Sequence, residues 1–224
     1  MIKVIELPID KDMGGLTSYV LQLYRMIDKK EFELTLLSYD DPQNFDVNYN
    51  VETVSRPYHI IQFYKKMKCL LSEEKNIIHF HQSYVNIIPI LIAKLAGFKT
   101  IILHAHSSSI DDNRKIVRFL KTGLHKVGRF LLPYLVDTYI GCSTKASEWM
   151  FPRKCIDSDS YYLLHNAIDL DLYDRNMNLG LEVRQKFNIP KDALVVGHIG
   201  RFTPVKNHPF IIDIFKEVLK QNPN

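Results

Sequence analysis

Cysteine is scarce in this chain. Only Cys69, Cys142 and Cys155 occur among its 224 residues, and no two of them form a CxxC pair. An odd, sparse set of thiols does not suit a disulfide-stabilised secreted domain, so we expect reduced cysteines in a cytoplasmic protein. The same spacing argues against a cysteine-based metal site, and we expect no bound metal.

The chain also lacks a hydrophobic run long enough to cross a membrane. Its longest apolar segment, residues 86–98, contains Pro89 and Lys94, whereas a spanning helix needs about 20 apolar residues. The N-terminus holds one lysine and a short apolar stretch that ends near Pro8. This pattern predicts a first β-strand and not a signal peptide.

No dense block of basic residues occurs, which argues against nucleic acid as a partner. The chain has 29 Lys and Arg against 25 Asp and Glu, a net charge of +4. A mildly basic balance is typical of a solvated surface. The alternative is a weak attraction to anionic lipid headgroups or to nucleotide-bearing substrates.

Short apolar runs alternate with segments of helical spacing along the first 170 residues. Runs such as IIHF and TIILH do not alternate with polar residues, which indicates strands buried on both faces of a parallel sheet. The order predicts a doubly wound, Rossmann-like α/β sheet. The expected strands are residues 3–9, 32–38, 51–55, 76–81, 100–106, 138–143 and 161–168, and the expected helices are 16–27, 60–72, 84–96, 111–135 and 144–150.

A polar stretch after Asp169 predicts a domain boundary. We expect a first domain over residues 1–170 and a linker over 171–192 that includes a short helix at 181–187. A strand at 193–199 and a helix at 209–220 would then open a second domain, of which residues 193–224 hold only the beginning.

Ligands of open α/β sheets bind beyond the carboxyl ends of the strands, so the loops there are the candidate sites. Gly14 and Gly15 follow the first strand and precede a helix. Paired glycines let backbone N–H groups approach a phosphate, although a plain tight turn has the same sequence. Neither a GxGxxG nor a GxxxxGK[ST] motif is present, so a standard dinucleotide site and a P-loop are not supported.

Two histidine pairs end neighbouring strands. His79 and His81 form one pair, His104 and His106 the other, and residues two apart share one face of a strand. Four histidines could indicate zinc, but no carboxylate or thiolate set is evident to complete a site, and core or capping histidines are commoner. Because Ser107 and a polar loop follow His106, that histidine is the best candidate to bind a sugar hydroxyl or stabilise a developing charge.

The segment GRFTPVKN, residues 200–207, predicts a site for a diphosphate. Arg201 and Lys206 place two cations on a glycine-containing turn between an expected strand and helix, and Asn207 follows them. Two further motifs have simpler readings: HNAID at 165–169 is by itself a turn signal, and Ser143 is an expected helix N-cap because no GxSxG surrounds it.

Taken together, these motifs resemble glycosyltransferase family 4 of the GT-B fold, in the manner of its bacterial polysaccharide-type members. The features that carry the resemblance, in chain order, are Gly14-Gly15, HFHQS at 79–83, HAHSS at 104–108, GCS at 141–143, HNAID at 165–169 and GRFTPVKN at 200–207.

The resemblance implies two Rossmann-like domains facing across a cleft and a hexosyltransferase activity in cell-surface polysaccharide synthesis. A sugar would pass from a nucleotide-sugar to a saccharide or lipid-linked acceptor, usually with retention and without a metal. The nucleotide-sugar is then a substrate, and no cofactor is implied.

The resemblance also assigns roles to residues. Arg201 and Lys206 would hold the donor diphosphate, and His106 would lie beside the donor sugar. The backbone at Gly14 and Gly15 would approach the phosphates and the acceptor. Further cleft candidates are Ser107, Asn207 and Asn166, the last in a hinge-side turn where Ala167 replaces the family's usual glycine.

One departure from the family concerns the second domain, in which a pair of glutamates normally grips the donor. No counterpart occurs by Asn224, so we expect a fragment that is inactive alone. The alternatives are a non-catalytic binding module and a sugar-nucleotide epimerase or phosphorylase on the same scaffold. A basic, aromatic segment at residues 58–68 indicates either peripheral contact with the inner face of a membrane or an ordinary amphipathic helix, which is the simpler interpretation.

Overall fold

The computed structural model describes residues 1–12, 14–71, 76–170 and 177–221. The chain divides into two compact units, Met1–Asp169 and Leu170–Asn224. Each unit is described below by itself.

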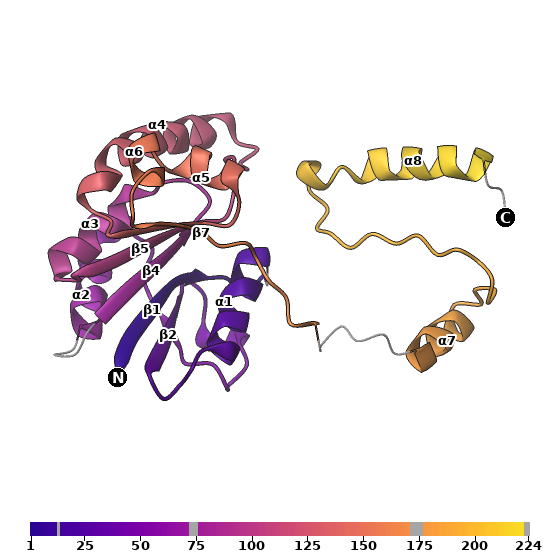
Figure 1. Ribbon diagram of the computed structural model, residues 1–224, viewed down its shortest axis with the longest axis horizontal. Coiled ribbons are helices and arrows are strands. Elements are labelled where there is room, and N and C mark those ends of the chain that lie inside the picture. Colours follow the sequence, from indigo (N-terminus) through magenta and orange to yellow (C-terminus); the bar gives the residue numbers. More distant parts are fainter. Residues whose placement is uncertain (13, 72–75, 171–176, 222–224) are drawn as a thin grey trace. The chain divides into compact units, whose positions relative to one another are not determined.

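The first unit is built on a parallel sheet whose strand order is β3-β2-β1-β4-β5-β6-β7 (Figure 1). Every neighbouring pair of strands runs parallel. This arrangement confirms the predicted doubly wound α/β sheet. The strands are β1 (Ile2–Ile9), β2 (Phe32–Ser38), β3 (Val51–Thr53), β4 (Asn76–Gln82), β5 (Thr100–Ala105), β6 (Thr138–Gly141) and β7 (Tyr161–Leu163).

Helices cover the sheet on two sides, because right-handed crossovers place α1 on one face and α2, α3 and α4 on the other (Figure 1). The larger hydrophobic cluster includes Phe63, Phe80 and Ile90, and a smaller one joins α1 to β2 through Val20 and Leu36. The helices of this unit are α1 (Gly15–Met26), η1 (Pro42–Asn44), α2 (Ile60–Leu70), α3 (Ile87–Ala96), α4 (Lys115–Leu131), η2 (Leu132–Tyr134), α5 (Thr144–Met150) and α6 (Arg153–Ile156).

Local signals fix several helix ends. The Asn86 side chain accepts a hydrogen bond from Ile88 N at the start of α3, and Gly97, at φ 114°, ends that helix in a left-handed conformation. Ser143 Oγ accepts from Ala146 N at 3.2 Å, which confirms that Ser143 is the N-cap of α5.

Several predicted elements are shorter than expected, and two of them have a clear physical reason. The helix predicted from residue 111 begins at Lys115, and Asp112 before it bonds to Arg114 and Lys121 instead of lying in the first turn. The last strand ends at Leu163 and not at residue 168, because its partner β6 offers only four residues for pairing.

The second unit contains helices α7 (Met177–Lys186), η4 (Pro204–Lys206) and α8 (His208–Gln221). The helix predicted at 181–187 is therefore found, but it begins earlier. The strand predicted at residues 193–199 is wrong: this segment has no regular structure. A β-strand needs a hydrogen-bonded neighbour, and within the described part of this unit there is none.

Among the described residues, no helix has the length and apolar character that a bilayer span requires. The basic, aromatic segment at residues 58–68 lies mostly in α2. This helix buries Phe63 and Met67 and exposes Lys65 and Lys68. The same helix also leaves Ile60 and Ile61 exposed.

Candidate functional site

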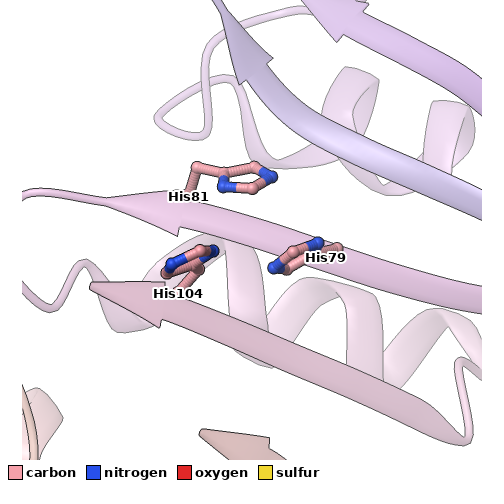
Figure 2. A group of neighbouring side chains, drawn as sticks. All are labelled: His79, His81 and His104. Carbon is pink, nitrogen blue, oxygen red and sulfur yellow. The ribbon is translucent and has the colours of Figure 1, made fainter. Parts of the chain in front are cut away.

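Polar side chains gather where the central strands β1, β4 and β5 end. Glu6 lies opposite His79 in the register of β1 and β4, and His81 lies opposite His104 in the register of β4 and β5. Figure 2 shows three of these histidines close together on two adjacent strands. We call the group the Glu6–histidine cluster; it comprises Glu6, His79, His81, His104 and His106.

Short hydrogen bonds connect the cluster. His81 Nε2 lies 2.6 Å from Glu6 Oε2, and His79 Nδ1 lies 3.0 Å from the same oxygen. His81 Nδ1 lies 2.8 Å from His106 Nε2. An ionised carboxylate only accepts hydrogen bonds, so both histidines donate to Glu6.

Burial and neighbouring groups shift the pKa of four members of the cluster. Burial alone would raise the pKa of Glu6, but charge and hydrogen bonds from His79 and His81 outweigh it and hold that pKa well below its usual range. Burial, followed by the neighbouring histidines, lowers the pKa of His81 to about 4 and of His106 to about 3. Burial and His106 also depress the pKa of His104. At neutral pH Glu6 is therefore ionised, whereas His81, His104 and His106 are neutral.

Three nitrogens of the cluster are buried without a hydrogen-bond partner among the described residues: Nε2 of His79 and both ring nitrogens of His104. An unpaired buried polar atom is costly, and native proteins contain few of them. His79, His81 and His104 each offer one ligand atom within 4.8 Å of the others, so this group has the chemistry to hold a metal ion.

His106, the predicted catalytic residue, directly follows β5 and is partly buried. Besides the bond to His81, its backbone N–H donates to Gln82 O at 3.0 Å, and its ring meets that of Tyr19 edge-on. Ser107 Oγ donates to Ser109 O at 3.1 Å, so this hydroxyl is engaged in its own loop.

Gly14 and Gly15 lie at the start of α1, the helix that carries Tyr19. A Cβ at either position would meet nothing within 4 Å, so packing does not demand glycine there. Gly14 O accepts from Ser18 N in the first helical turn, and Gly15 is exposed. The open space at this helix N-terminus is compatible with a phosphate.

The remaining predicted residues lie elsewhere. Asn166 is exposed in the segment after β7, beside His165, whose Nδ1 lies 3.1 Å from Cys142 O. Arg201, Lys206 and Asn207 belong to the second unit and are exposed. Asn207 has φ 45° and terminates η4 just before α8.

A pocket of about 250 Å³ opens next to the cluster, at the carboxyl ends of β1 and β4. His81 lines it together with apolar residues such as Leu16 and polar groups from the segment after β4. Among these, Gln82 exchanges hydrogen bonds with the backbone of Asn86, which fixes its amide.

Sequence reasoning missed Glu6 and Tyr19. The sequence did contain a signal for Glu6, because it is the single acidic residue within the run KVIELP. The structure leaves only 1% of this residue exposed. A charged residue is almost never buried unless it is paired. Tyr19 matched a helical apolar face and gave no separate signal, yet its ring contacts three histidines of the cluster.

The fold and the cluster together define the class of protein. It is a doubly wound α/β protein with polar groups toward the carboxyl ends of its central strands, where such proteins bind ligands. The profile of Glycosyltransferase Family 4 matches residues 13–172. The chain belongs to that family, which confirms the resemblance seen in its motifs.

Two curated relatives are similar over most of the chain. One is "Putative glycosyltransferase EpsF" of Bacillus subtilis (strain 168), 26% identical over 219 residues, 90% of this chain and 54% of the relative. The other is an Escherichia coli UDP-Gal:alpha-D-GlcNAc-diphosphoundecaprenol alpha-1,3-galactosyltransferase, 20% identical over 99% of this chain and 59% of the relative. The chain thus spans little more than half the length of these relatives.

Two solved structures share the fold. The S. aureus MnaA-UDP co-structure matches with a TM-score of 0.52 and 16% identity, over 84% of this chain and 50% of that one. UDP-N-acetylglucosamine 2-epimerase from Rickettsia bellii matches with a TM-score of 0.50 and 13% identity, over 99% and 60%. At such low identity these matches show the fold alone.

Proposed function

We propose that the protein takes part in the transfer of a hexose from a nucleotide-sugar to a saccharide or lipid-linked acceptor, with retention, in polysaccharide synthesis. The observation that carries the proposal is the family match over residues 13–172, which includes both histidine pairs. The Glu6–histidine cluster supports it by placing His106 directly after a central strand, where a bound sugar would lie.

In this proposal His106 contacts the donor sugar. Its imidazole is neutral, and the bond from Nε2 to His81 holds the ring in place. A neutral, fixed ring can hydrogen-bond a sugar hydroxyl without moving during the reaction, which favours the transition state. Ser107 and Asn166 would make further contacts in the cleft.

The donor diphosphate would be held by Arg201 and Lys206, with Asn207 beside them and the N-terminus of α1 at Gly14 and Gly15 as a second source of N–H donors. Charge-assisted contacts of this kind bind the phosphates and stabilise the leaving nucleotide, so no metal ion is needed at the diphosphate. Both cations are exposed in these 224 residues, which supports weak donor binding and no turnover by this segment alone.

The acceptor would be a saccharide joined through a diphosphate to a polyprenol. The E. coli relative acts, by its printed name, on GlcNAc-diphosphoundecaprenol. The pocket of about 250 Å³ beside His81 has room for part of a sugar, and its fixed Gln82 amide and Asn86 lie among apolar walls. Apolar walls with a few placed polar groups are typical of small-ligand sites.

Membrane contact belongs to this proposal, but α4 suits it better than α2. Lys115, Arg118 and Lys126 lie along one flank of α4, and the helix contains no acidic residue. A helix with an exposed apolar stripe and basic flank binds anionic bilayers. The stripe consists of Ile116 (77% exposed), Phe119 (77%), Leu120 (63%), Val127 (56%) and Phe130 (72%), followed by Tyr134 (68%).

Transfer of radiolabel tests the proposal. The full gene product is incubated with labelled UDP-hexoses and a synthetic GlcNAc-diphosphopolyprenol, and the lipid-linked product is extracted. We expect labelled lipid with the donor's anomeric configuration, and a loss of about 100-fold or more in kcat/KM for His106→Ala. His59→Ala, which removes an exposed histidine at the start of α2, should leave kcat/KM unchanged.

Two outcomes would contradict the proposal. Release of an epimerised nucleotide-sugar without acceptor would identify an epimerase on this scaffold. Binding of the acceptor with no transfer from any UDP-hexose would favour the binding module.

A further inference from the structure

The unpartnered nitrogens of the Glu6–histidine cluster call for a physical explanation. Within the part of the chain that the structure describes, Nε2 of His79 and both nitrogens of His104 are buried without a partner, and His104 has no exposed surface. Each such atom has lost its hydrogen bonds to water and has gained none within the described part of the protein. Since these residues belong to a group whose ligand atoms lie within 4.8 Å of one another, one bound cation could take up Nε2 of His79 and one nitrogen of His104 together.

The hydrogen bonds to Glu6 determine where the imidazole lone pairs lie. His79 donates from Nδ1, at 3.0 Å, so its buried Nε2 is the ring nitrogen that can face a cation. His81 donates from Nε2, at 2.6 Å, so its lone pair is on Nδ1. Neutral His104 has one lone pair, and neither of its nitrogens has a partner among the described residues. Each of the three histidines thus has a ring nitrogen that does not bond to Glu6.

We propose that His79, His81 and His104 bind a divalent transition-metal ion, with zinc as the best match, and that Glu6 orients two of the three ligands. Imidazole nitrogens suit zinc, copper, nickel and iron, whereas magnesium and calcium require oxygen ligands. Metal-bound histidines typically donate their second N–H to a carboxylate, which is the relation that His79 and His81 have to Glu6. Three histidines leave a fourth position for water.

Charge also favours a cation here. The cluster contains the buried carboxylate of Glu6, which is 1% exposed. A divalent ion would compensate the buried negative charge and occupy the lone pairs in one step. The nearby Tyr19 ring, 5.2 Å from that of His104 and perpendicular to it, covers the cluster on the α1 side.

Ion binding would have a consequence for His106. Its Nε2 donates to the His81 lone pair at 2.8 Å, which is the lone pair the ion would take. Binding therefore breaks this bond and frees the His106 ring. Ion binding can be tested without a transfer assay, because all three ligands and Glu6 belong to the first unit.

Metal analysis of purified protein is the direct test. The protein is prepared without a histidine tag, its metal content is measured by mass spectrometry, and the metal-free form is titrated with zinc or cobalt. We expect about one ion per chain, a zinc-dependent rise in Tm, and the visible absorption of tetrahedral cobalt. Wild-type protein that takes up no ion at micromolar zinc would overturn the proposal, and this arm needs no variant.

Variants locate the ion. His79→Ala and His104→Ala should abolish binding, and Glu6→Gln should weaken it about 10- to 100-fold. His125→Ala serves as the matched control, since it removes a buried histidine outside the cluster, and it should retain the full stoichiometry. Circular dichroism checks that each variant is folded. Folded His79→Ala and His104→Ala proteins that still bind zinc as tightly as wild type would place the ion elsewhere and overturn the assignment.

Discussion

The buried histidine of α4, His125, is held neutral by its surroundings. Its Nδ1 accepts a hydrogen bond from Val85 N at 3.0 Å, and its ring stacks on Trp149 with centroids 4.2 Å apart. Burial, with the nearby charge of Arg129 as the second cause, lowers the pKa of His125 to about 4. Protonation would place a charge in a site without water and would break the hydrogen bond from Val85 N. The folded state therefore disfavours the charged ring.

We predict that His125 makes stability depend on pH between about 6.5 and 4. The unfolded chain binds this proton near pH 6.5 and the folded chain near 4, so the contribution is complete above pH 6.5 and is lost as pH falls toward 4. The full shift corresponds to about 3 kcal/mol, and partial screening by solvent reduces the contribution to about 2 kcal/mol. Urea unfolding at pH 7.5 and pH 4.5 should show a smaller loss for His125→Gln than for wild type. An identical loss in both would contradict the prediction, and His59→Gln should behave as wild type.

Helix α4 combines close packing on one side with an apolar surface on the other. Gly128 lies against Val85, where a Cβ would overlap Val85 Cγ1, whereas Gly123 in the same helix has open space around it. The opposite side carries the exposed stripe that includes Phe119 and Phe130. The same element therefore anchors itself to the first unit and presents a surface for a partner.

We predict that Gly128→Ala destabilises the protein by about 1–3 kcal/mol, because the added methyl group overpacks against Val85. Gly123→Ala is the matched control and should stabilise by about 0.5–1 kcal/mol through helix propensity. Urea unfolding measures both. Adding Val85→Ala should make the Gly128→Ala substitution less costly than it is in wild type, and strict additivity of the two would exclude this contact as the cause.

We predict that α4 binds anionic vesicles. Phe119→Ser with Phe130→Ser should weaken sedimentation with phosphatidylglycerol vesicles at least about 10-fold, because each buried phenyl ring contributes about 1.5–3 kcal/mol. Leu95→Ser, an exposed apolar position on α3, is the control and should change binding little. Equal binding by all variants would show that the apolar stripe of α4 does not contact the vesicles. Weaker binding only when Lys65 and Lys68 are neutralised would assign the contact to α2.

The buried residues of the described chain all belong to the first unit, from Val4 to Cys155. In the second unit, α8 has no buried residue, and Ile199 and Phe202 are almost fully exposed. Residues 13–172, the span of the family profile, cover most of the part that has its own core, which also includes β1 before them. Stability is expected to reside there.

We predict that a chain ending at Asp169 retains the free energy of unfolding within about 0.5 kcal/mol, because none of the deleted residues that the structure describes is buried. It should also aggregate less, since apolar side chains such as Ile199 and Phe202 are gone. A chain ending at Phe151 is the matched control: it removes β7 and the buried Cys155 and should be clearly less stable. Loss of cooperative unfolding in the longer version would contradict the prediction.

Much of the fold could be predicted from local sequence patterns. Apolar runs such as TIILH identified the central strands, and Ser143 was found as an N-cap, because both signals depend on a few adjacent residues. The strand predicted at 193–199 has the same apolar pattern but, within the described part of its unit, no neighbour to pair with. Apolar composition is a property of the segment, whereas pairing is a property of what surrounds it.

For the candidate site, the sequence by itself determined which strand ends carry polar residues and which family the chain resembles. The roles of His106, Arg201 and Lys206 stay predictions. Only the tertiary structure decided that Glu6 meets two histidines from a strand more than 70 residues away. The register of parallel strands brings these side chains onto one face, and burial then makes their charge and lone pairs interdependent, which no local pattern encodes.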